Sequence, residues 1–143
     1  MLSQDEDGRT KLYVAAKNNK IEEAKKMIER ANNLNIASEL VNKGANDYIY
    51  NRETPLFQTS LHGYLQMAEL LLNNGAEVDK ANIYGGTPLI RASALGRLEV
   101  VNLLIEHQAD VHLKNDDGKT ALHYARREGY TAIEKALRKA GAK

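Results

Sequence analysis

Short apolar segments alternate with polar, glycine-containing stretches along most of the chain. The clearest example is residues 82–116, where a turn with two glycines leads into Thr87 and Pro88. This pair is typical of a helix start, because threonine can cap free N–H groups and proline lacks the N–H at the first helical position. The pattern predicts a first helix that ends at Gly96 and a second helix over residues 98–106.

The second of these predicted helices is apolar on nearly every side. Its apolar residues are Leu98, Val100, Val101, Leu103, Leu104 and Ile105. A helix that is apolar all round has to be covered by neighbours on more than one side. One pair of helices cannot bury this surface alone, so the pattern predicts several pairs stacked side by side.

The pattern of residues 82–116 recurs in the chain at a step of 33 residues. Three tripeptides keep this step, namely Thr54-Pro55-Leu56, Thr87-Pro88-Leu89 and Thr120-Ala121-Leu122. The glycines that end the first predicted helix keep it as well, at Gly63, Gly96 and Gly129. A weaker copy opens the chain around Thr10. So many positions held in phase indicate an internal repeat.

The period and the Thr-Pro-Leu…Ala…Gly…Leu-Leu…Gly-Ala-x-Val pattern resemble the ankyrin repeat over essentially the whole chain. The resemblance implies four units, at about residues 4–47, 51–80, 82–114 and 115–143. Each unit would be two antiparallel helices followed by a hairpin-like loop. The expected fold is an all-α solenoid of stacked helix–turn–helix–loop units, which forms a single domain over residues 1–143. The usual role of the family is protein–protein binding.

The first unit departs from the pattern by about 13 additional residues, which lie near residues 31–43. Apolar spacing predicts a short extra helix over about residues 36–43, after a break. We expect its apolar side to pack on the first unit, with a role in partner binding as the alternative. The following loop is two residues shorter than the others and lacks the turn glycine, so its tip should adopt a different turn.

Composition narrows the possible functions. The net charge of the 143 residues is +1, so no overall field attracts nucleic acid or an anionic membrane. The basic end of the chain, residues 126–143, is better explained by favourable charge at a helix C-terminus. There is no cysteine and no membrane-spanning apolar run, and the acidic residues 1–7 lack the apolar core of a signal peptide. We expect a soluble, intracellular, cytoplasmic protein without nucleic-acid or membrane partners.

Candidate chemistry is sparse. The four histidines, His62, His107, His112 and His123, lack the spacing and the acidic neighbours of a metal site. The pair Gly85-Gly86 precedes a helix but belongs to neither of the two common phosphate-binding patterns, so it is interpreted as a turn. No nucleophile motif is present. We therefore expect no catalytic residues, no metal, no cofactor and no enzymatic activity.

The ankyrin resemblance places the binding surface on the loop tips and on the outward side of the first helix of each unit. The candidate partner-binding residues are Tyr48, Tyr50, Arg52, Gln58, Leu61, His62, Ile83, Tyr84, Arg91, Ala94, Leu95, Asp116 and Arg127. The end units contribute charged residues, whereas the two middle units contribute apolar and aromatic ones. Apolar and aromatic side chains rimmed by charge are typical of an interface centre. The alternative is that Leu61, Leu95 and, less readily, the tip residues pack against the neighbouring unit.

The sequence therefore predicts a non-enzymatic protein-interaction module that binds a protein partner through the loop tips and the concave helix face. A homodimer formed through the middle units is an alternative, although we expect a monomer. An engineered chain on an ankyrin scaffold is another alternative. The insertion, the shortened loop and the uneven helix faces favour natural divergence over design.

Overall fold

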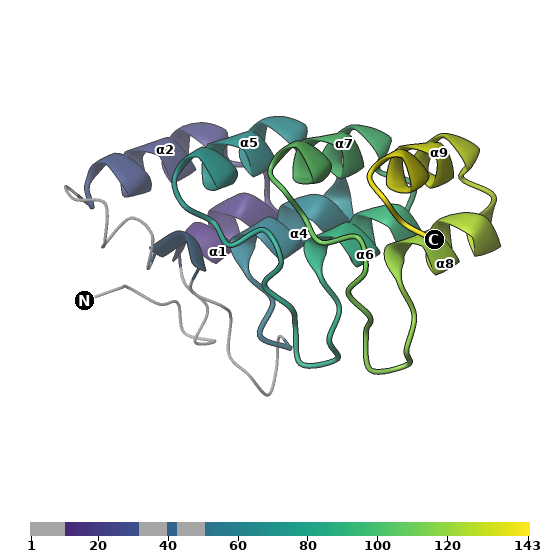
Figure 1. Ribbon diagram of the computed structural model, residues 1–143. Coiled ribbons are helices and arrows are strands. Elements are labelled where there is room, and N and C mark those ends of the chain that lie inside the picture. Colours follow the sequence, from purple (N-terminus) through teal and green to yellow (C-terminus); the bar gives the residue numbers. More distant parts are fainter. Residues whose placement is uncertain (1–10, 32–39, 43–50) are drawn as a thin grey trace.

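A computed structural model of the protein describes residues 11–31, 40–42 and 51–143. Its helices are α1 (Lys11–Lys17), α2 (Ile21–Glu29), α4 (Pro55–His62), α5 (Leu65–Asn73), α6 (Pro88–Ala94), α7 (Leu98–Glu106), α8 (Ala121–Glu128) and α9 (Thr131–Lys139). The first helices of the pairs form one row and the second helices form another, while the loops between pairs project to one side (Figure 1). The described residues thus form an all-helical solenoid, which confirms the predicted fold.

Three of the first helices begin in the same way, at Thr54, Thr87 and Thr120. Each threonine has extended backbone angles, and its hydroxyl oxygen accepts a hydrogen bond from the backbone N–H three residues later. The donors are Phe57 (3.2 Å), Ile90 (3.2 Å) and His123 (3.3 Å). This bond satisfies one of the N–H groups that a helix start leaves without a partner. The repeated threonine therefore sets where each of these helices begins.

The ends of these helices hold adjacent units together. Gly63 and Gly96 have φ of 76° and 77°, a left-handed conformation that favours glycine. A Cβ atom at Gly96 would lie 2.9 Å from the ring of Tyr130, and one at Gly63 would lie 2.9 Å from Cδ of Arg97. Arg97 and Tyr130 each follow the helix-ending glycine of their own unit. Each packs directly on the corresponding glycine of the preceding unit. Arg97 adds a hydrogen bond from Nε to the carbonyl oxygen of Leu61, at 3.1 Å.

The core lies between the two rows and between neighbouring pairs. Fully buried side chains of the first row include Leu12, Tyr13, Leu56, Phe57 and Leu89, and those of the second row include Met67, Leu71, Val100, Val101, Leu104 and Leu137. Both sides of α7 are covered, by α5 and by α9, as its apolar sequence requires. Each helix pair therefore depends on its neighbours for burial.

The loop tips are built by an asparagine side chain. Asn82 Oδ1 accepts hydrogen bonds from the backbone N–H groups of Tyr84 (3.0 Å) and Gly86 (2.9 Å). Asn115 builds the next tip in the same way, through the N–H groups two and four residues later. An asparagine that replaces backbone partners in this manner fixes a tight turn. Both tips are consequently held in one conformation by their own sequence.

Adjacent tips are also linked to each other. The N–H of Ile83 donates to the carbonyl oxygen of Asn51, and the N–H of Asp116 donates to that of Tyr84, both at 2.9 Å. The two bonds are equivalent in the repeat. Asn51 and Arg52, the described end of the tip without a turn glycine, both have positive φ, of 60° and 57°, whereas in the third tip Gly85 has positive φ and Tyr84 does not. The tips form a hydrogen-bonded row along the side of the solenoid.

The described part of the insertion packs on the stack. Residues 40–42 are helical, and Val41 is fully buried in the core. The Asn42 side chain donates to the carbonyl oxygen of Gly75 (2.8 Å) and accepts from the N–H of Glu77 (2.6 Å). This end of the insertion thus joins the first unit to the loop of the second. The remainder of the predicted extra helix lies outside the described residues.

Gly96→Ala and Gly129→Ala should separate inter-unit contact from backbone strain. Both glycines have nearly the same φ, 77° and 75°, but a Cβ at Gly129 would meet nothing within 4 Å. Gly129→Ala should cost about 1 kcal/mol of unfolding free energy from the left-handed backbone alone. Gly96→Ala should cost at least about 1 kcal/mol more, because the ring of Tyr130 has to move. Urea denaturation of both variants measures the difference, and equal costs would contradict the contact.

Candidate functional site

The structure places most of the predicted binding residues on one continuous side of the solenoid. Exposed members are Arg52, Ile83, Tyr84, Arg91, Leu95, Asp116 and Arg127, and half-buried members are Leu61, His62 and Ala94. They lie on the loop tips and on the first-row helices α4, α6 and α8 (Figure 1). Tyr48 and Tyr50 lie outside the described residues. Exposure makes these positions available to a partner, and their role in binding stays a prediction.

Gln58 is an exception, because its expected exposure is wrong. The residue is only 4% exposed, and its amide donates a hydrogen bond to the carboxylate of Glu53. Gln58 occupies the repeat position of Arg91, which is exposed. The shorter, neutral side chain turns back onto the acid at the base of its own tip. Gln58 is therefore buried below the candidate surface, where it hydrogen-bonds the base of the second tip.

Apolar exposure is concentrated at the predicted centre. The exposed large apolar residues among those the structure describes are Ile83 (39%), Tyr84 (58%), Leu95 (36%) and Leu65 (36%). The first three were predicted from the sequence. Leu65 was not, and it lies at the start of α5, in the other row of helices. The backbone of this tip is hydrogen-bonded to the preceding tip at Ile83, while the side chains of Ile83 and Tyr84 remain exposed.

A pocket of about 480 Å³ opens on this side between the third and fourth units. Its lining includes the predicted residues Tyr84, Arg91, Ala94, Leu95 and Arg127, together with Asn82, Gly86, Ile90, Asn115, Asp117, Tyr124, Glu128 and Tyr130. Tyr124 and Tyr130 are not among the candidate residues derived from the sequence. The repeat register could have found Tyr124, because it is the residue 33 positions after Arg91. Pockets of this size are large enough for a side chain or a short peptide segment.

The two arginines of the pocket are each held by an aromatic ring. The guanidinium carbon of Arg91 lies 5.7 Å from the centre of the Phe57 ring, and that of Arg127 lies 4.9 Å from the centre of the Tyr124 ring. Such cation–π contacts orient a long side chain that would otherwise be mobile. Arg127 also forms an exposed ion pair with Glu128 at 2.9 Å. The cations thus have defined positions on the first-row helices.

Glu53 lies half-buried at the base of the second tip. Burial raises the pKa of its carboxyl above the ordinary 4.5, and the positive charge of Arg91 opposes this rise in part. Hydrogen bonds from the side chains of Gln58, Asn51 and Asn82 also oppose it. Since Asn82 builds the third tip, this carboxyl connects two neighbouring tips.

His62 contributes an aromatic rather than a charged element to the surface. Its ring stacks on Tyr64, with centres 5.1 Å apart and an angle of 20° between the rings. Burial lowers the pKa of His62 below the ordinary 6.5, and the positive charges of Arg97 and Lys17 lower it further. The neutral form is therefore favoured at neutral pH.

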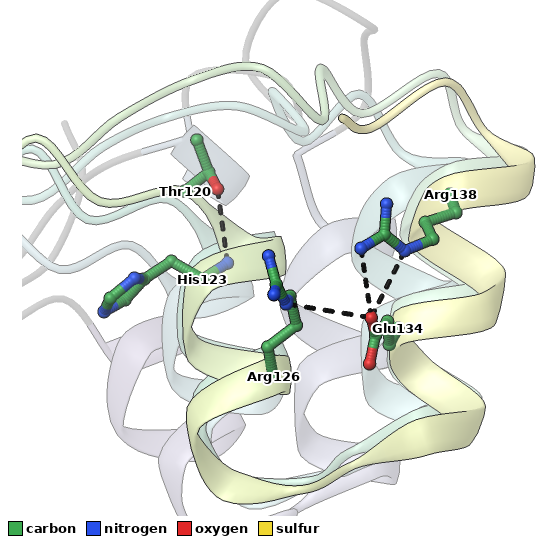
Figure 2. A network of polar contacts seen from close by, with 5 residues as sticks. All are labelled: Thr120, His123, Arg126, Glu134 and Arg138. Carbon is green, nitrogen blue, oxygen red and sulfur yellow. Dashed lines mark hydrogen bonds and ion pairs between the residues drawn. The ribbon is translucent and has the colours of Figure 1, made fainter.

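Ion pairs link the two helices of the final unit, α8 and α9. Figure 2 shows Glu134 between Arg126 of α8 and Arg138 of α9, with His123 and Thr120 at the start of α8. One oxygen of Glu134 contacts Arg138 at 3.1 Å and Arg126 at 3.8 Å. Part of the basic charge is thus compensated within the unit.

The described residues offer no metal-binding cluster of three or more His, Cys, Asp or Glu side chains. None of the helices in the described part of the chain combines the length and apolar character needed to cross a membrane.

The geometry defines the protein as a helical-repeat solenoid with a row of linked tips beside an exposed helix face. The family described as "Ankyrin repeats (3 copies)" matches residues 1–82, 26–115 and 80–143. The chain belongs to the ankyrin repeat family. Members of this family are generally protein–protein interaction modules and are typically not enzymes. No curated protein matches the chain in sequence.

Glu53→Gln should change how stability depends on pH. The folded state binds the Glu53 proton more tightly than the unfolded state, so ionisation of this carboxyl costs stability at neutral pH. This cost should disappear as pH falls from 7 towards 4.5, and the wild type should gain stability relative to the variant over this range. Thermal unfolding at several pH values measures the gain.

Glu99→Gln, at an exposed position on α7, controls for the loss of one negative charge. A stability difference between the wild type and Glu53→Gln that stayed constant with pH, or moved the other way, would contradict the raised pKa.

Proposed function

We propose that this protein is a non-enzymatic module that binds a protein partner through its loop tips and the concave face of its first-row helices. The observation that carries the proposal is the concentration of exposed apolar side chains on one side of the stack. Ile83, Tyr84 and Leu95 are exposed beside a pocket with arginines at its wall. Aromatic and arginine side chains around a concave centre are typical of interface hot spots.

The remaining members of the proposed surface surround this centre. They are Arg52, Leu61, His62, Arg91, Ala94, Asp116 and Arg127, to which the sequence adds Tyr48 and Tyr50. Charged residues at the edges suit a polar rim that favours the correct partner. We infer a monomer, in which the apolar centre is available to another protein. The cytoplasmic location expected from the cysteine-free sequence is part of the proposal.

Replacing both Ile83 and Tyr84 with Ser tests the surface. Both side chains are exposed, so the free energy of unfolding should change by no more than about 0.5 kcal/mol per site. Affinity capture from a native lysate should recover a partner with the wild type and lose it with the double variant. Removal of two hot-spot side chains corresponds to a loss of affinity of at least about thirtyfold.

Leu65→Ser is the matched control, because Leu65 is about as exposed as Ile83 but lies in the other row of helices. Its capture should equal that of the wild type. Retained binding by the Ile83/Tyr84 double variant would show that the surface is wrongly assigned. Sedimentation over a concentration series tests the homodimer, and a concentration-dependent dimer lost in the double variant would support that alternative instead.

A further inference from the structure

The pocket between the third and fourth units presents hydrogen-bond donors that lack acceptors. The Tyr124 hydroxyl oxygen accepts a hydrogen bond from Asn115 Nδ2 at 2.7 Å, which leaves the hydroxyl hydrogen to be donated. Within the described residues, no acceptor takes that hydrogen. Arg91 lies over the ring of Phe57, and no ion pair within 4.0 Å engages its guanidinium in the described part of the chain.

Glu53 and Glu128 both interact with these arginines, and each is either already engaged or only weakly held. Glu53 interacts electrostatically with Arg91. Its half-buried carboxylate is, however, already hydrogen-bonded by three amide side chains. Glu128 pairs with Arg127 at 2.9 Å, and both side chains are exposed. An exposed pair of this kind contributes little and can exchange partners. Arg91 can therefore bind an incoming anion. Arg127 can do so as well when the anion replaces Glu128 as its partner.

Charge within the pocket is unevenly distributed. On the helix side lie Arg91 of α6 and the exposed pair of Arg127 with Glu128 on α8, whereas Asp117 lines the tip side and Asp116 lies next to it in the sequence. A carboxylate is repelled from the tips and attracted towards the helices. Beyond Arg91, at the C-terminal end of α6 and the start of α9, the lining is apolar, with Leu95 (36% exposed) and the half-buried ring of Tyr130. The pocket thus matches an acidic group and an apolar group side by side.

We propose that this pocket binds a short acidic segment of the partner, in which an Asp or Glu stands next to a large apolar residue. The carboxylate accepts hydrogen bonds from Arg91 and from the Tyr124 hydroxyl, and the apolar side chain packs on Leu95 and Tyr130. Arginine can bind a carboxylate through two parallel hydrogen bonds, which fixes its orientation. This inference rests on the proposed function and adds the chemistry of the partner to it.

Selection from a random peptide display library against the wild-type chain tests the inference. The selected peptides should contain Asp or Glu adjacent to Leu, Ile or Phe. Synthetic peptides from the selection are then compared with versions in which the acid is replaced by Gln or Asn. This neutral replacement should lower affinity at least about tenfold, because it removes the charge-assisted bonds. Affinity for the acidic peptide should also fall with added salt.

Arg91→Gln in the protein should lower the affinity for the acidic peptide by a similar factor. For this variant, replacing the peptide acid should then have little further effect, since the two changes remove the same interaction. Lys135→Gln, on the exposed side of α9, is the control for loss of one positive charge and should bind like the wild type. Tyr124→Phe is a second variant, which keeps the ring and should weaken binding by about threefold to tenfold.

Selection of neutral or basic peptides, or of none, would overturn the inference. So would equal binding of the acidic peptide to the wild type and to both pocket variants, each verified as folded by its thermal transition. These results leave the Ile83/Tyr84 experiment unaffected, because that experiment uses the captured partner and the loop tip. Failure of the pocket chemistry is therefore distinguishable from failure of the proposed function.

Discussion

The second helices of the two middle repeats, α5 and α7, are apolar on both flanks, and the rest of the structure depends on covering them. A helix pair taken alone would leave residues such as Val100, Val101 and Leu104 in water, so burial is completed by neighbours on either side. Stacking in turn brings Tyr130 onto Gly96 and Arg97 onto Gly63. It also brings the tips close enough for one tip to hydrogen-bond to the next.

The same constraint explains where function can be located. Side chains in the inter-helix core are committed to the stack, and changes there cost stability. The stack positions the tips and the outward face of the first row, but many of their side chains remain exposed to solvent. Ile83 shows the division clearly, because its N–H binds the preceding tip while its side chain remains exposed. A rigid scaffold that presents free side chains along one side suits the protein-binding role typical of the family.

Local signals made the fold predictable from the sequence. Thr87 with Pro88 and Gly96 mark helix boundaries through backbone chemistry that acts within a few residues, and the step of 33 carries that assignment to the other units. Exposure of Ile83 and Tyr84 also followed, since burial is hard to arrange at a turn tip. The helix boundaries and the exposure of the tip depend on interactions between residues close in the sequence, which sequence patterns reveal directly.

The parts that were missed depend on contacts between units. Gln58 turns onto Glu53 because that acid lies at the base of its own tip, which spacing alone does not show. Tyr130 packs on Gly96, and this contact places its ring in the wall of the pocket. Asn42 joins the insertion to a loop more than thirty residues away. Such pairings become visible only after the units have been stacked.

Hydrogen–deuterium exchange with and without the captured partner tests the central claim most directly. The partner should slow exchange in two segments, residues 82–95 and residues 115–130, which contain the third and fourth tips and the helices beside the pocket. Exchange in α5 and α7, in the opposite row, should change little. Protection concentrated in that row, with the two tips unaffected, would contradict the assignment of the binding surface.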